Sequence, residues 1–405
     1  MAVEIIRKYG LLLGGFGFSY LGNWIYLVAL NLMVWHLTHS ATAVAGIFIV
    51  GPIARILTNF VAGSIIDRSN KRSIMIAMDI TRGLIVFLMP FMTSIWLIYS
   101  LLFLANIASS FFGPSSTYYI AKYVHDNDKQ RFNALLGTLN SGSFMLGPAI
   151  AGVLIAVFNI SIAIWINSVT FFVCAWVISR LPNIEEAVKE KRVMLTMNVI
   201  IADFKMVWYF IKQHPKFLKF FMAYQIALMV AFALDSQEMT FIKHNLLASD
   251  SLYGVLVSIA GVGAIVGGFL AIALVHKISI SAYLGIGLTC TMLSYTAFYA
   301  SSNIWFATAC FITLGVFMAF SNTGYDTVYQ KNIPPHLMGR FGSSVSLIQS
   351  VIQIILTFSL GLLADWFSLQ LVAVSFGAVG LIFAIFMAIH IATNKQALHI
   401  VGESK

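Results

Sequence analysis

Long apolar runs recur along the whole chain, and they constrain the fold more than any other feature of the sequence. A helix needs ~20 mostly apolar residues to cross the hydrocarbon core of a bilayer. With short turns between them, 405 residues hold roughly a dozen such helices and little else. We therefore predict an all-α integral membrane protein with twelve transmembrane helices. The predicted spans cover residues 10–35, 43–66, 73–92, 95–118, 132–157, 161–181, 217–241, 252–275, 279–300, 303–328, 341–364 and 368–392.

The composition excludes several classes of protein. Hydrophobic residues make up 60% of the chain and charged residues only 10%, whereas a soluble protein carries about 25% charged residues. A soluble enzyme, a nucleic-acid-binding protein and a disordered scaffold are therefore excluded. The three cysteines lie inside apolar runs and indicate neither disulfides nor a metal site. Because the sequence shows no phosphate-binding glycine loop and no hydrolytic triad motif, we expect no enzyme activity and no cofactor.

The basic residues predict the orientation in the membrane. The chain has 24 Lys and Arg against 15 Asp and Glu, which gives a net charge of +9. With the N-terminus placed inside, nearly all Lys and Arg fall in cytoplasmic segments; only Lys243 falls outside, and Arg55 and Arg82 fall within spans. Cytoplasmic loops carry the excess of Lys and Arg in membrane proteins. Both termini are therefore predicted to be cytoplasmic, and the net charge requires no nucleic-acid partner.

One long polar interval divides the predicted spans six and six. It covers residues 182–216, and its second part mixes charged side chains such as Asp203 and Lys205 with Val, Ile, Met, Trp and Phe. This pattern is typical of an amphipathic helix on a membrane surface. The predicted organisation is a six-helix bundle at 1–181, a cytoplasmic linker at 182–216, and a second six-helix bundle with a short cytoplasmic tail at 217–405.

The chain resembles itself at an offset of 209 residues. An even number of spans per half keeps the two halves parallel, and such repeats place a substrate path between them near the bilayer midplane. This indicates two pseudo-symmetric halves and a transporter rather than a receptor or an anchor. The matching pairs are Lys122 and Lys331, Arg131-Phe132 and Arg340-Phe341, Ser141 and Ser350, and Gly152 and Gly361.

A motif follows the second predicted span and reads Gly63-Ser-Ile-Ile-Asp67-Arg68-Ser-Asn-Lys71-Arg72. Glycine permits another helix to approach closely, and a carboxylate can accept hydrogen bonds at a helix N-terminus. The motif resembles the signature loop between spans two and three of the major facilitator superfamily, which implies a cytoplasmic latch; a basic loop with no gating role is the alternative. The candidate gate residues are Gly63, Asp67, Arg68, Lys71, Arg72, Arg131, Asp326 and Arg340, with Asp326 facing Lys331 or Arg340.

The fifth predicted span contains Gly147-Pro148 and Gly152. Proline kinks a helix, and small neighbours allow close packing there. The segment resembles the Gly-Pro motif of superfamily antiporters, which implies an exporter; an ordinary kinked helix is the alternative.

The whole chain is similar to bacterial drug–proton antiporters of the macrolide-efflux type. The similarity is strongest from Trp35 to Asp79 and from Leu102 to Pro114. Ala105 stands where the family often carries an arginine linked to proton transfer. The proton coupling that the resemblance implies therefore needs another residue, or differs in this chain.

Charged residues within predicted spans are functional candidates because lipid tolerates them poorly. Arg55 and Arg82 are the candidate cavity charges. Asp79 lies three residues before Arg82, so the two can pair on one helical face, and this pair could serve charge neutralisation as readily as function. Asp235 and Glu238 are expected on one face of the outer third of the seventh span. A carboxylate in a partly dry cavity can take up and release a proton, so Asp235, Glu238 and Asp79 are the candidates for proton coupling; a water-exposed helix end is the alternative for the first two.

Aromatic and amide side chains in three spans suit a bulky amphipathic ligand, because they combine apolar contact with adaptable hydrogen bonds. Packing between helices is the alternative role for most of them. The candidate substrate-binding residues are Tyr20, Asn23, Trp24, Tyr26, Asn31, Tyr224, Gln225, Gln349 and Gln353.

Together these observations predict a secondary active transporter in a bacterial cytoplasmic membrane. It would export amphipathic drugs or similar molecules by alternating access, in exchange for protons, and act as a monomer in the lipid bilayer. An exporter of one endogenous metabolite, lipid or siderophore, with different or no proton coupling, is the first alternative. A non-transporting membrane sensor on a transporter fold is a more distant one.

Overall fold

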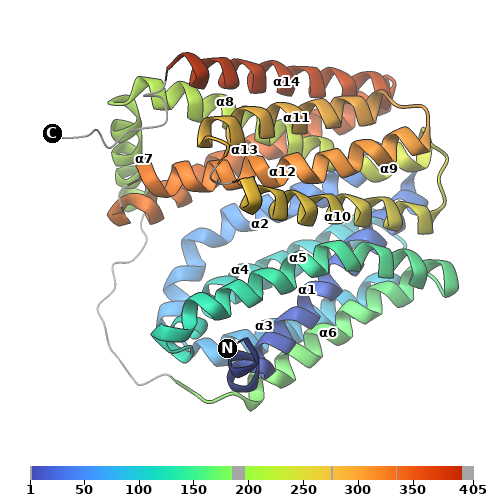
Figure 1. The fold of residues 1–405 in the computed structure, drawn as a ribbon. Helices are drawn as coiled ribbons and strands as arrows, with labels where there is room; N and C mark the ends of the chain where they lie inside the picture. Colours follow the sequence, from blue (N-terminus) through green and yellow to red (C-terminus); the bar gives the residue numbers. More distant parts are fainter. Residues whose placement is uncertain (1, 185–196, 275–276, 334, 395–405) are drawn as a thin grey trace. The chain divides into compact units, whose positions relative to one another are not determined.

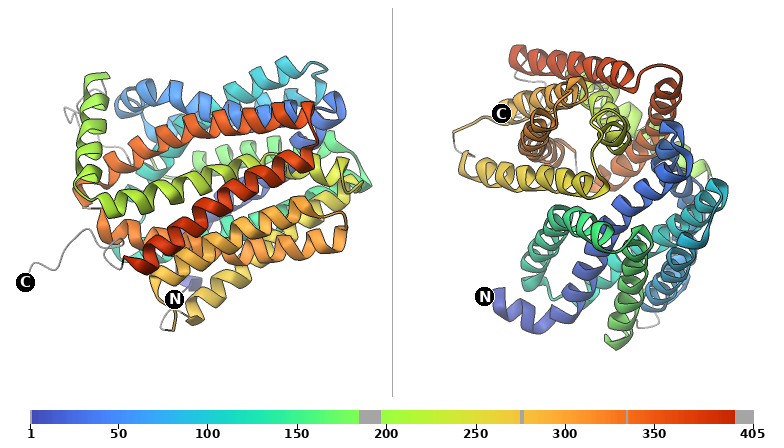
Figure 2. Two further views of the ribbon diagram at one scale, coloured as in Figure 1. Left: turned by 90° about the horizontal axis from the view of Figure 1, so that it is seen from above. Right: turned by 90° about the vertical axis from the view of Figure 1, so that its right-hand side faces the viewer.

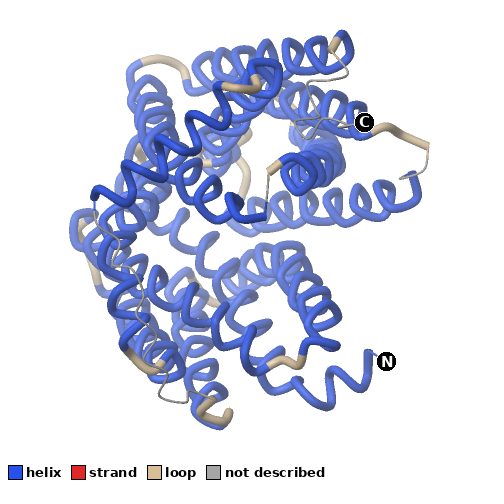
Figure 3. Tube along the Cα trace, turned by 90° about the vertical axis from the view of Figure 1, so that its left-hand side faces the viewer, coloured by secondary structure: helices blue, strands red, loops and turns tan. Residues whose placement is uncertain are grey.

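The computed structural model describes residues 2–184, 197–274, 277–333 and 335–394, and within them it shows helices, loops and no strand (Figures 1 and 3). A short 3-10 helix, Met89–Phe91, follows α3. The α-helices are α1 Ala2–Thr38, α2 Ala41–Arg68, α3 Lys71–Leu88, α4 Ile95–Tyr123, α5 Asp126–Val157, α6 Ile160–Arg180, α7 Met197–Lys212, α8 Pro215–Asp235, α9 Glu238–His244, α10 Asp250–Leu274, α11 Ile280–Ala300, α12 Ile304–Asn332, α13 Pro335–Trp366 and α14 Leu369–Thr393.

Eleven helices in the described ranges are long and apolar enough to cross a bilayer. The predicted span at 279–300 corresponds to α11, which is not among the eleven. It has 21 residues, but its Ser, Thr and Tyr side chains lower its hydropathy. The predicted all-helical membrane fold is confirmed.

Helix boundaries confirm the internal repeat. The helices α2, α3, α4, α5 and α6 begin 209 residues before α10, α11, α12, α13 and α14, respectively. The repeated phenylalanines also occupy equivalent environments: Phe132 and Phe341 are both fully buried. Phe132 packs against Tyr9, and Phe341 packs against Phe221 and Tyr329. The two sequence halves therefore fold to the same helical pattern.

The chain forms two compact units. The first comprises Met1–His39, Val50–Thr196 and Asp250–Ser258, and the second comprises Ser40–Ile49, Met197–Ser249 and Ile259–Lys405. In the first unit α1 packs on α5 and α6, and α3 packs on α4 and α6. In the second unit α11 packs on α12 and α14, and α8 packs on α14 and α13.

The first turns of α10 belong to the first unit and the rest of α10 to the second. Conversely, the first turns of α2 belong to the second unit and the rest of α2 to the first. In the first unit the start of α10 joins α1, where Asp250 lies 2.8 Å from Nε2 of His36. In the second unit the Asp365 carboxylate accepts hydrogen bonds from the backbone N–H groups of Ala41 (2.9 Å) and Thr42 (3.2 Å) at the start of α2. A carboxylate stabilises a helix start because the first N–H groups have no partner within the helix.

The predicted linker helix is present as α7 and belongs to the second unit. It packs against α13 and α8 and lies across their ends rather than alongside them (Figures 1 and 2). Val207 is buried in this contact, whereas Trp208 and Tyr209 are exposed. The amphipathic pattern of the sequence therefore corresponds to a helix with one face packed on the second unit.

Candidate functional site

A break between α8 and α9 separates the two carboxylates of the predicted seventh span. α8 ends at Asp235, α9 begins at Glu238, and Ser236 and Gln237 lie between them. The expectation that both carboxylates lie on one face of a continuous helix was therefore wrong. The Ser236 hydroxyl bonds back to the carbonyl oxygen of Ala233 (2.6 Å), and the Gln237 backbone (φ −108°, ψ 0°) leaves the helical region.

The carboxylates nevertheless lie next to each other. The Glu238 carboxyl neighbours Asp235, and the Tyr295 hydroxyl of α11 donates a hydrogen bond to Asp235. Both acidic residues are half-buried. In the part of the chain that the structure describes, no Lys or Arg forms an ion pair with either of them; the nearby Lys243 donates to the carbonyl oxygen of Ala248 at 3.0 Å. The group is thus a carboxyl pair held by a tyrosine.

Electrostatics favour a proton on this pair. Glu238 is the first residue of α9, a seven-residue helix outside the eleven candidate spans. Burial raises the pKa of the Glu238 carboxyl well above its usual value, and the adjacent Asp235 carboxylate raises this pKa further. Two carboxyl groups this close share a proton because both cannot ionise without mutual repulsion.

The charged pair of α3 has a different environment. The predicted pairing of Asp79 with Arg82 is confirmed: the guanidinium donates to the carboxylate, and both side chains are buried. The Arg82 guanidinium carbon also lies 4.3 Å from the ring centre of Phe112 and 4.4 Å from that of Phe171. Arg82 is therefore enclosed by its counter-ion and two aromatic rings, and Asp79 has a permanent positive partner.

Two of the predicted amides meet in the second unit. The Gln349 side chain of α13 donates a hydrogen bond to the Gln225 side-chain oxygen of α8 at 2.7 Å, and Gln225 donates to the Tyr325 hydroxyl at 3.0 Å. Tyr325 stacks on Tyr224 with ring centres 4.3 Å apart. Gln353 lies one turn further along α13 and is half-buried.

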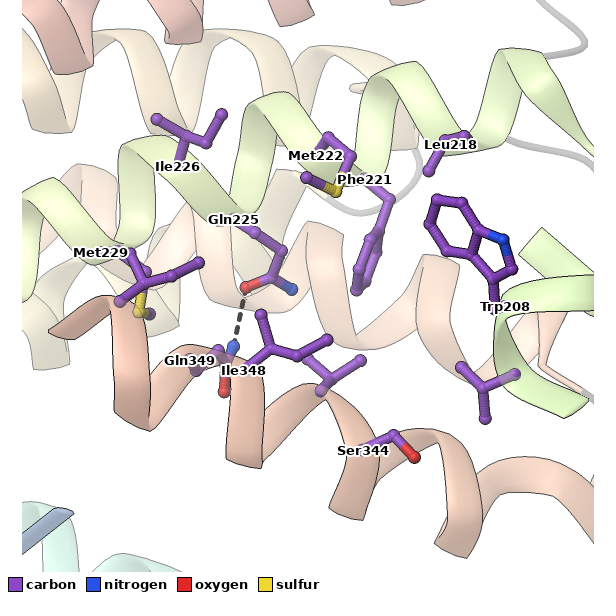
Figure 4. Close-up of a pocket in the computed structure, with 13 residues that line it drawn as sticks. Trp208, Leu218, Phe221, Met222, Gln225, Ile226, Met229, Ser344, Ile348 and Gln349 are labelled. Atoms are coloured by element: carbon purple, nitrogen blue, oxygen red, sulfur yellow. Dashed lines mark hydrogen bonds between the residues drawn. The ribbon is translucent and has the colours of Figure 1, made fainter. Parts of the chain in front are cut away.

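This amide network borders a pocket between α7, α8 and α13 (Figure 4). Its free space, the open mouth included, is about 680 Å³. Figure 4 shows Trp208 of α7 at one end of the pocket, Ile226 and Met229 of α8 at the other, and Gln225 and Gln349 between them. The surface that lines the pocket is almost entirely apolar.

The predicted substrate-binding residues of α1 are mostly engaged in packing. Asn31 is buried and donates to the Leu27 carbonyl oxygen at 3.0 Å, and the Tyr26 hydroxyl contacts the Met89 sulfur at 3.1 Å. Trp24 packs on Phe144 with ring centres 4.6 Å apart.

The other two candidates on α1, Tyr20 and Asn23, are half-buried, and Tyr20 packs against the core of the first unit. A Cβ on Gly147 would lie 2.5 Å from the Trp24 Cβ. The close approach expected at the Gly147-Pro148 motif is therefore present between α5 and α1.

The predicted gate residues occupy several environments. Arg72 donates to the carbonyl oxygens of Ile178 (3.1 Å) and Ser179 at the end of α6, and the Lys71 ammonium lies 4.9 Å from the Tyr118 ring centre. The surroundings of Gly63 and the side chains of Asp67, Arg68 and Arg340 lie outside the described residues.

Three other predicted charges are exposed. Arg131 and Asp326 are exposed, and no ion pair joins Asp326 to Lys331 among the residues described. Arg55, the other predicted cavity charge, is exposed on α2.

Sequence reasoning missed the tyrosines that organise the second unit. Tyr295 and Tyr325 lie 60 and 100 residues from the side chains that they bond, so no local spacing links them. The polar content of α11 was a usable signal, because a helix that reduces its own hydropathy is expected to bury its polar groups against partners.

Comparison with known proteins places these features in a family. The family model described as Major Facilitator Superfamily matches residues 12–357. The chain is 23% identical over 362 residues to an uncharacterized MFS-type transporter, YfiS, of Bacillus subtilis (strain 168), covering 87% of this chain and 86% of that one. It is 28% identical over 189 residues to the putative bacilysin exporter BacE of the same organism, and this match spans under half of each chain, 44% and 46%.

Solved structures support the fold. The nucleoside transporter NupG superposes with a TM-score of 0.74 at 12% identity, covering 94% of this chain and 98% of that one. A bacterial homologue of the iron transporter ferroportin superposes with a TM-score of 0.69 at 15% identity, covering 95% and 99%. At these identities the likeness concerns the fold alone.

Proposed function

The chain belongs to the major facilitator superfamily, and we propose that it exports amphipathic small molecules in exchange for protons. In this proposal both termini are in the cytoplasm of a bacterial cell, and the protein alternates between inward-open and outward-open states as a monomer. Protons supply the energy and no cofactor takes part. A relative named as an exporter supports the direction of transport.

The carboxyl pair Asp235 and Glu238 carries the proposal of proton coupling. Protons would load the pair from the outside, where the proton concentration is higher, and leave it on the inside. Tyr295 would stabilise the ionised state of Asp235 by its hydrogen bond. Asp79 was the third candidate, but its ion pair with Arg82 supports a structural role more than repeated protonation.

The proposed gate and the proposed contact between helices correspond to the two motifs found in the sequence. The loop at Gly63 to Arg72 would latch the cytoplasmic side, and the bonds of Arg72 to α6 would hold the start of α3 in place. Gly147 would allow α5 to approach α1 closely during the transition.

Proton-driven uptake into inside-out vesicles tests the proposal. A vesicle interior more acidic than the medium should drive accumulation of a fluorescent amphipathic dye, and Asp235→Asn with Glu238→Gln should abolish the gradient dependence. Glu4→Gln, which removes an exposed carboxylate at the start of α1, is the matched control. Unchanged coupling in the double variant would refute the assignment of these carboxyl groups.

Export of one specific metabolite is the second candidate function. The match to the putative bacilysin exporter favours it, since that protein is named for one substrate. A deletion strain separates the two: a metabolite exporter leads to intracellular accumulation of one compound, whereas a broad exporter changes resistance to many drugs.

A further inference from the structure

Two side chains of the second unit hold the first residue of α2 through both of its backbone groups. The Gln237 side chain donates a hydrogen bond to the Ala41 carbonyl oxygen at 3.1 Å. The Asp365 carboxylate of α13 accepts from the Ala41 backbone N–H at 2.9 Å and from the Ser40 hydroxyl at 2.8 Å. Because α2 begins on the outside in the proposed orientation, we call the bonds of Gln237 and Asp365 to Ala41 the outer contact.

The outer contact has to break if the outer side of the protein opens. The first turns of α2 belong to the second unit, but the rest of the helix belongs to the first. Alternating access requires the two halves of a transporter to separate on one side at a time. Since α2 is one helix, separation on the outside pulls its first turns away from Gln237 and Asp365. The outer contact therefore stabilises the state that is closed to the outside.

The internal repeat shows that the close packing at this position needs no polar side chain. In the first unit, a Cβ on Gly152 of α5 would lie 2.6 Å from the Ser251 carbonyl oxygen at the start of α10. In the second unit, a Cβ on the equivalent Gly361 of α13 would lie 2.9 Å from the Ala45 Cβ of α2. The packing is thus repeated without the polar side chains, because the residues 209 positions before them are Val28 and Ala156.

Gln237 also belongs to the short segment that joins the two carboxyl groups. It lies between Asp235, the last residue of α8, and Glu238, the first residue of α9. Its side chain is fully buried, and its backbone carbonyl oxygen accepts from the Phe241 N–H at 2.9 Å in the first turn of α9. Protein interiors are close-packed. Gln237 therefore cannot keep its place if the carboxyl groups on either side of it move apart.

The charge on the carboxyl pair decides whether its two members stay together. A pair that shares a proton is held by that proton, whereas two ionised carboxylates at close range repel each other. In the structure Asp235 and Glu238 are neighbours and the outer contact is formed, which is the arrangement expected with a proton bound. Loss of the proton pushes the carboxylates apart and withdraws Gln237 from Ala41.

Other titratable groups near the carboxyl pair and the outer contact have to be separated from this effect. Tyrosine, cysteine and lysine ordinarily titrate above pH 8 and aspartate below pH 5, so histidine is the residue type that competes with the pair between these values. Among the described residues, the groups concerned are Tyr295 and Tyr299 of α11, Cys310 of α12, Asp365 of α13, Lys243 and His244 of α9, His36 with its partner Asp250, and His39.

We propose that Gln237 is a positioning residue that couples proton loading of the carboxyl pair to closure of the outer side, through its hydrogen bond to Ala41. Asp365 strengthens the closed state but lies on another helix and does not sense the proton. A proton taken up from outside closes the outer contact, and its release inside allows the contact to open again. The inference rests on the proposed proton exchange and adds the link between the proton site and the conformational change.

Distances between two spin labels on the outer side test this coupling. The labels are attached at Phe158→Cys, an exposed position after α5, and at Ser302→Cys, an exposed position before α12. The full chain, with its three native cysteines replaced by alanine, is placed in lipid nanodiscs without substrate or proton gradient. Electron paramagnetic resonance then gives the ratio of long to short distances, which is the ratio of outer-open to outer-closed protein. The pH response is the factor by which this ratio changes between pH 5 and pH 8.

We expect the open-to-closed ratio to rise about tenfold or more from pH 5 to pH 8, because a difference of one pKa unit between the two states corresponds to tenfold. Glu238→Gln should remove this pH response. Gln237→Met, which keeps the length of the side chain but has no donor, should remove it as well. Gln237→Asn is a second variant with the same expected result, because its amide is one methylene too short to reach Ala41.

Asp365→Asn is the matched control, since it weakens the same contact from the other side. Loss of a charged acceptor should raise the open-to-closed ratio roughly 10- to 100-fold at every pH and leave the pH response unchanged. A merely structural role of Gln237 predicts this same pattern for Gln237→Met. Replacing His36, His39 and His244 with glutamine should also leave the pH response in place.

Three results would overturn the inference. These are a native protein without a pH response, a response that survives both Gln237 variants, and a response that disappears with the three histidines. A response removed by Glu238→Gln but not by the Gln237 variants refutes the coupling role and leaves the proposed proton site intact. A response that survives Glu238→Gln refutes the proton site itself, so the two failures are distinguishable.

Discussion

Two pairs of charged residues, Asp79 with Arg82 and Asp235 with Glu238, have the same spacing in sequence and opposite surroundings. Asp79 and Arg82 of α3 form a buried ion pair, and two phenylalanine rings lie against the guanidinium. Asp235 and Glu238 at the α8–α9 break have the same separation but share a tyrosine and no cation among the described residues. A buried carboxylate paired with a cation stabilises a fold, whereas one next to a second carboxyl and a hydroxyl can exchange a proton.

Removal of Arg82 should produce the largest effect. Arg82→Ala leaves the Asp79 carboxylate buried and unpaired, and breaking a buried ion pair in this way costs about 3–5 kcal/mol. We expect a strongly lowered unfolding temperature in detergent. Replacing both partners, Asp79→Asn with Arg82→Gln, should restore most of the stability. An equal loss in the double variant would contradict a paired role.

Removal of the Tyr295 hydroxyl should come next. Its hydrogen bond goes to a charged acceptor, and such bonds contribute about 1.5–3 kcal/mol. Because Tyr295→Phe makes the ionised form of Asp235 less favourable, we expect proton-driven uptake to slow about tenfold or more. Tyr283→Phe is the matched control, since that hydroxyl of α11 bonds the Ala271 carbonyl oxygen (2.6 Å) away from the carboxyl pair. Equal slowing in both variants would indicate general loosening of α11.

The pH dependence of stability should distinguish the carboxyl pair of α8 and α9 from the ion pair of α3. The folded state raises the pKa of Glu238 above its usual 4.5, so it binds this proton more tightly than the unfolded state. Stability is therefore expected to fall as the pH rises from about 4.5 towards the folded pKa, by at most ~1.4 kcal/mol per pH unit. Glu238→Gln should flatten this slope in unfolding temperatures measured across pH. An unchanged slope would show that another group causes it.

Loss of one aromatic contact to Arg82 should have the smallest effect. Phe112→Leu removes one of two rings beside the guanidinium, and a cation–π contact contributes about 0.5–2 kcal/mol. The same substitution in the Asp79→Asn, Arg82→Gln background gives the packing contribution alone. The difference between the changes in unfolding free energy that Phe112→Leu causes in the two backgrounds gives the contribution of the cation–π contact. A difference of zero would show that Phe112 contributes to stability through packing alone.

Local relationships in the sequence were predictable. The Asp79–Arg82 pair follows from a spacing of three on one helix, and the internal repeat follows from residues such as Phe132 and Phe341, whose burial proved equivalent. The same rule of spacing failed at Asp235 and Glu238, because Ser236 and Gln237 leave the helix between them. A spacing rule holds only while the backbone remains helical.

Longer-range relationships were not predictable from one sequence. Gln225 and Gln349 were each singled out by residue type, but their hydrogen bond joins α8 to α13 across 124 residues. Tyr295 reaches Asp235 across 60 residues and had no local signal. These contacts depend on how the helices pack against one another, and the spacing of residues along a single helix does not reveal that packing.

By itself, the sequence determined the membrane class, the helical fold, its division into repeats and the positions where charge is costly, because hydrophobic length and charge act locally along the chain. Only the tertiary structure decided which charged side chains have an opposite charge beside them and which side chains each polar group bonds. The reason is physical: the cost of a buried charge or amide depends on the partners that packing brings to it. Arg82 and Tyr295 are such partners, and they give two carboxylates of similar sequence context different chemistry.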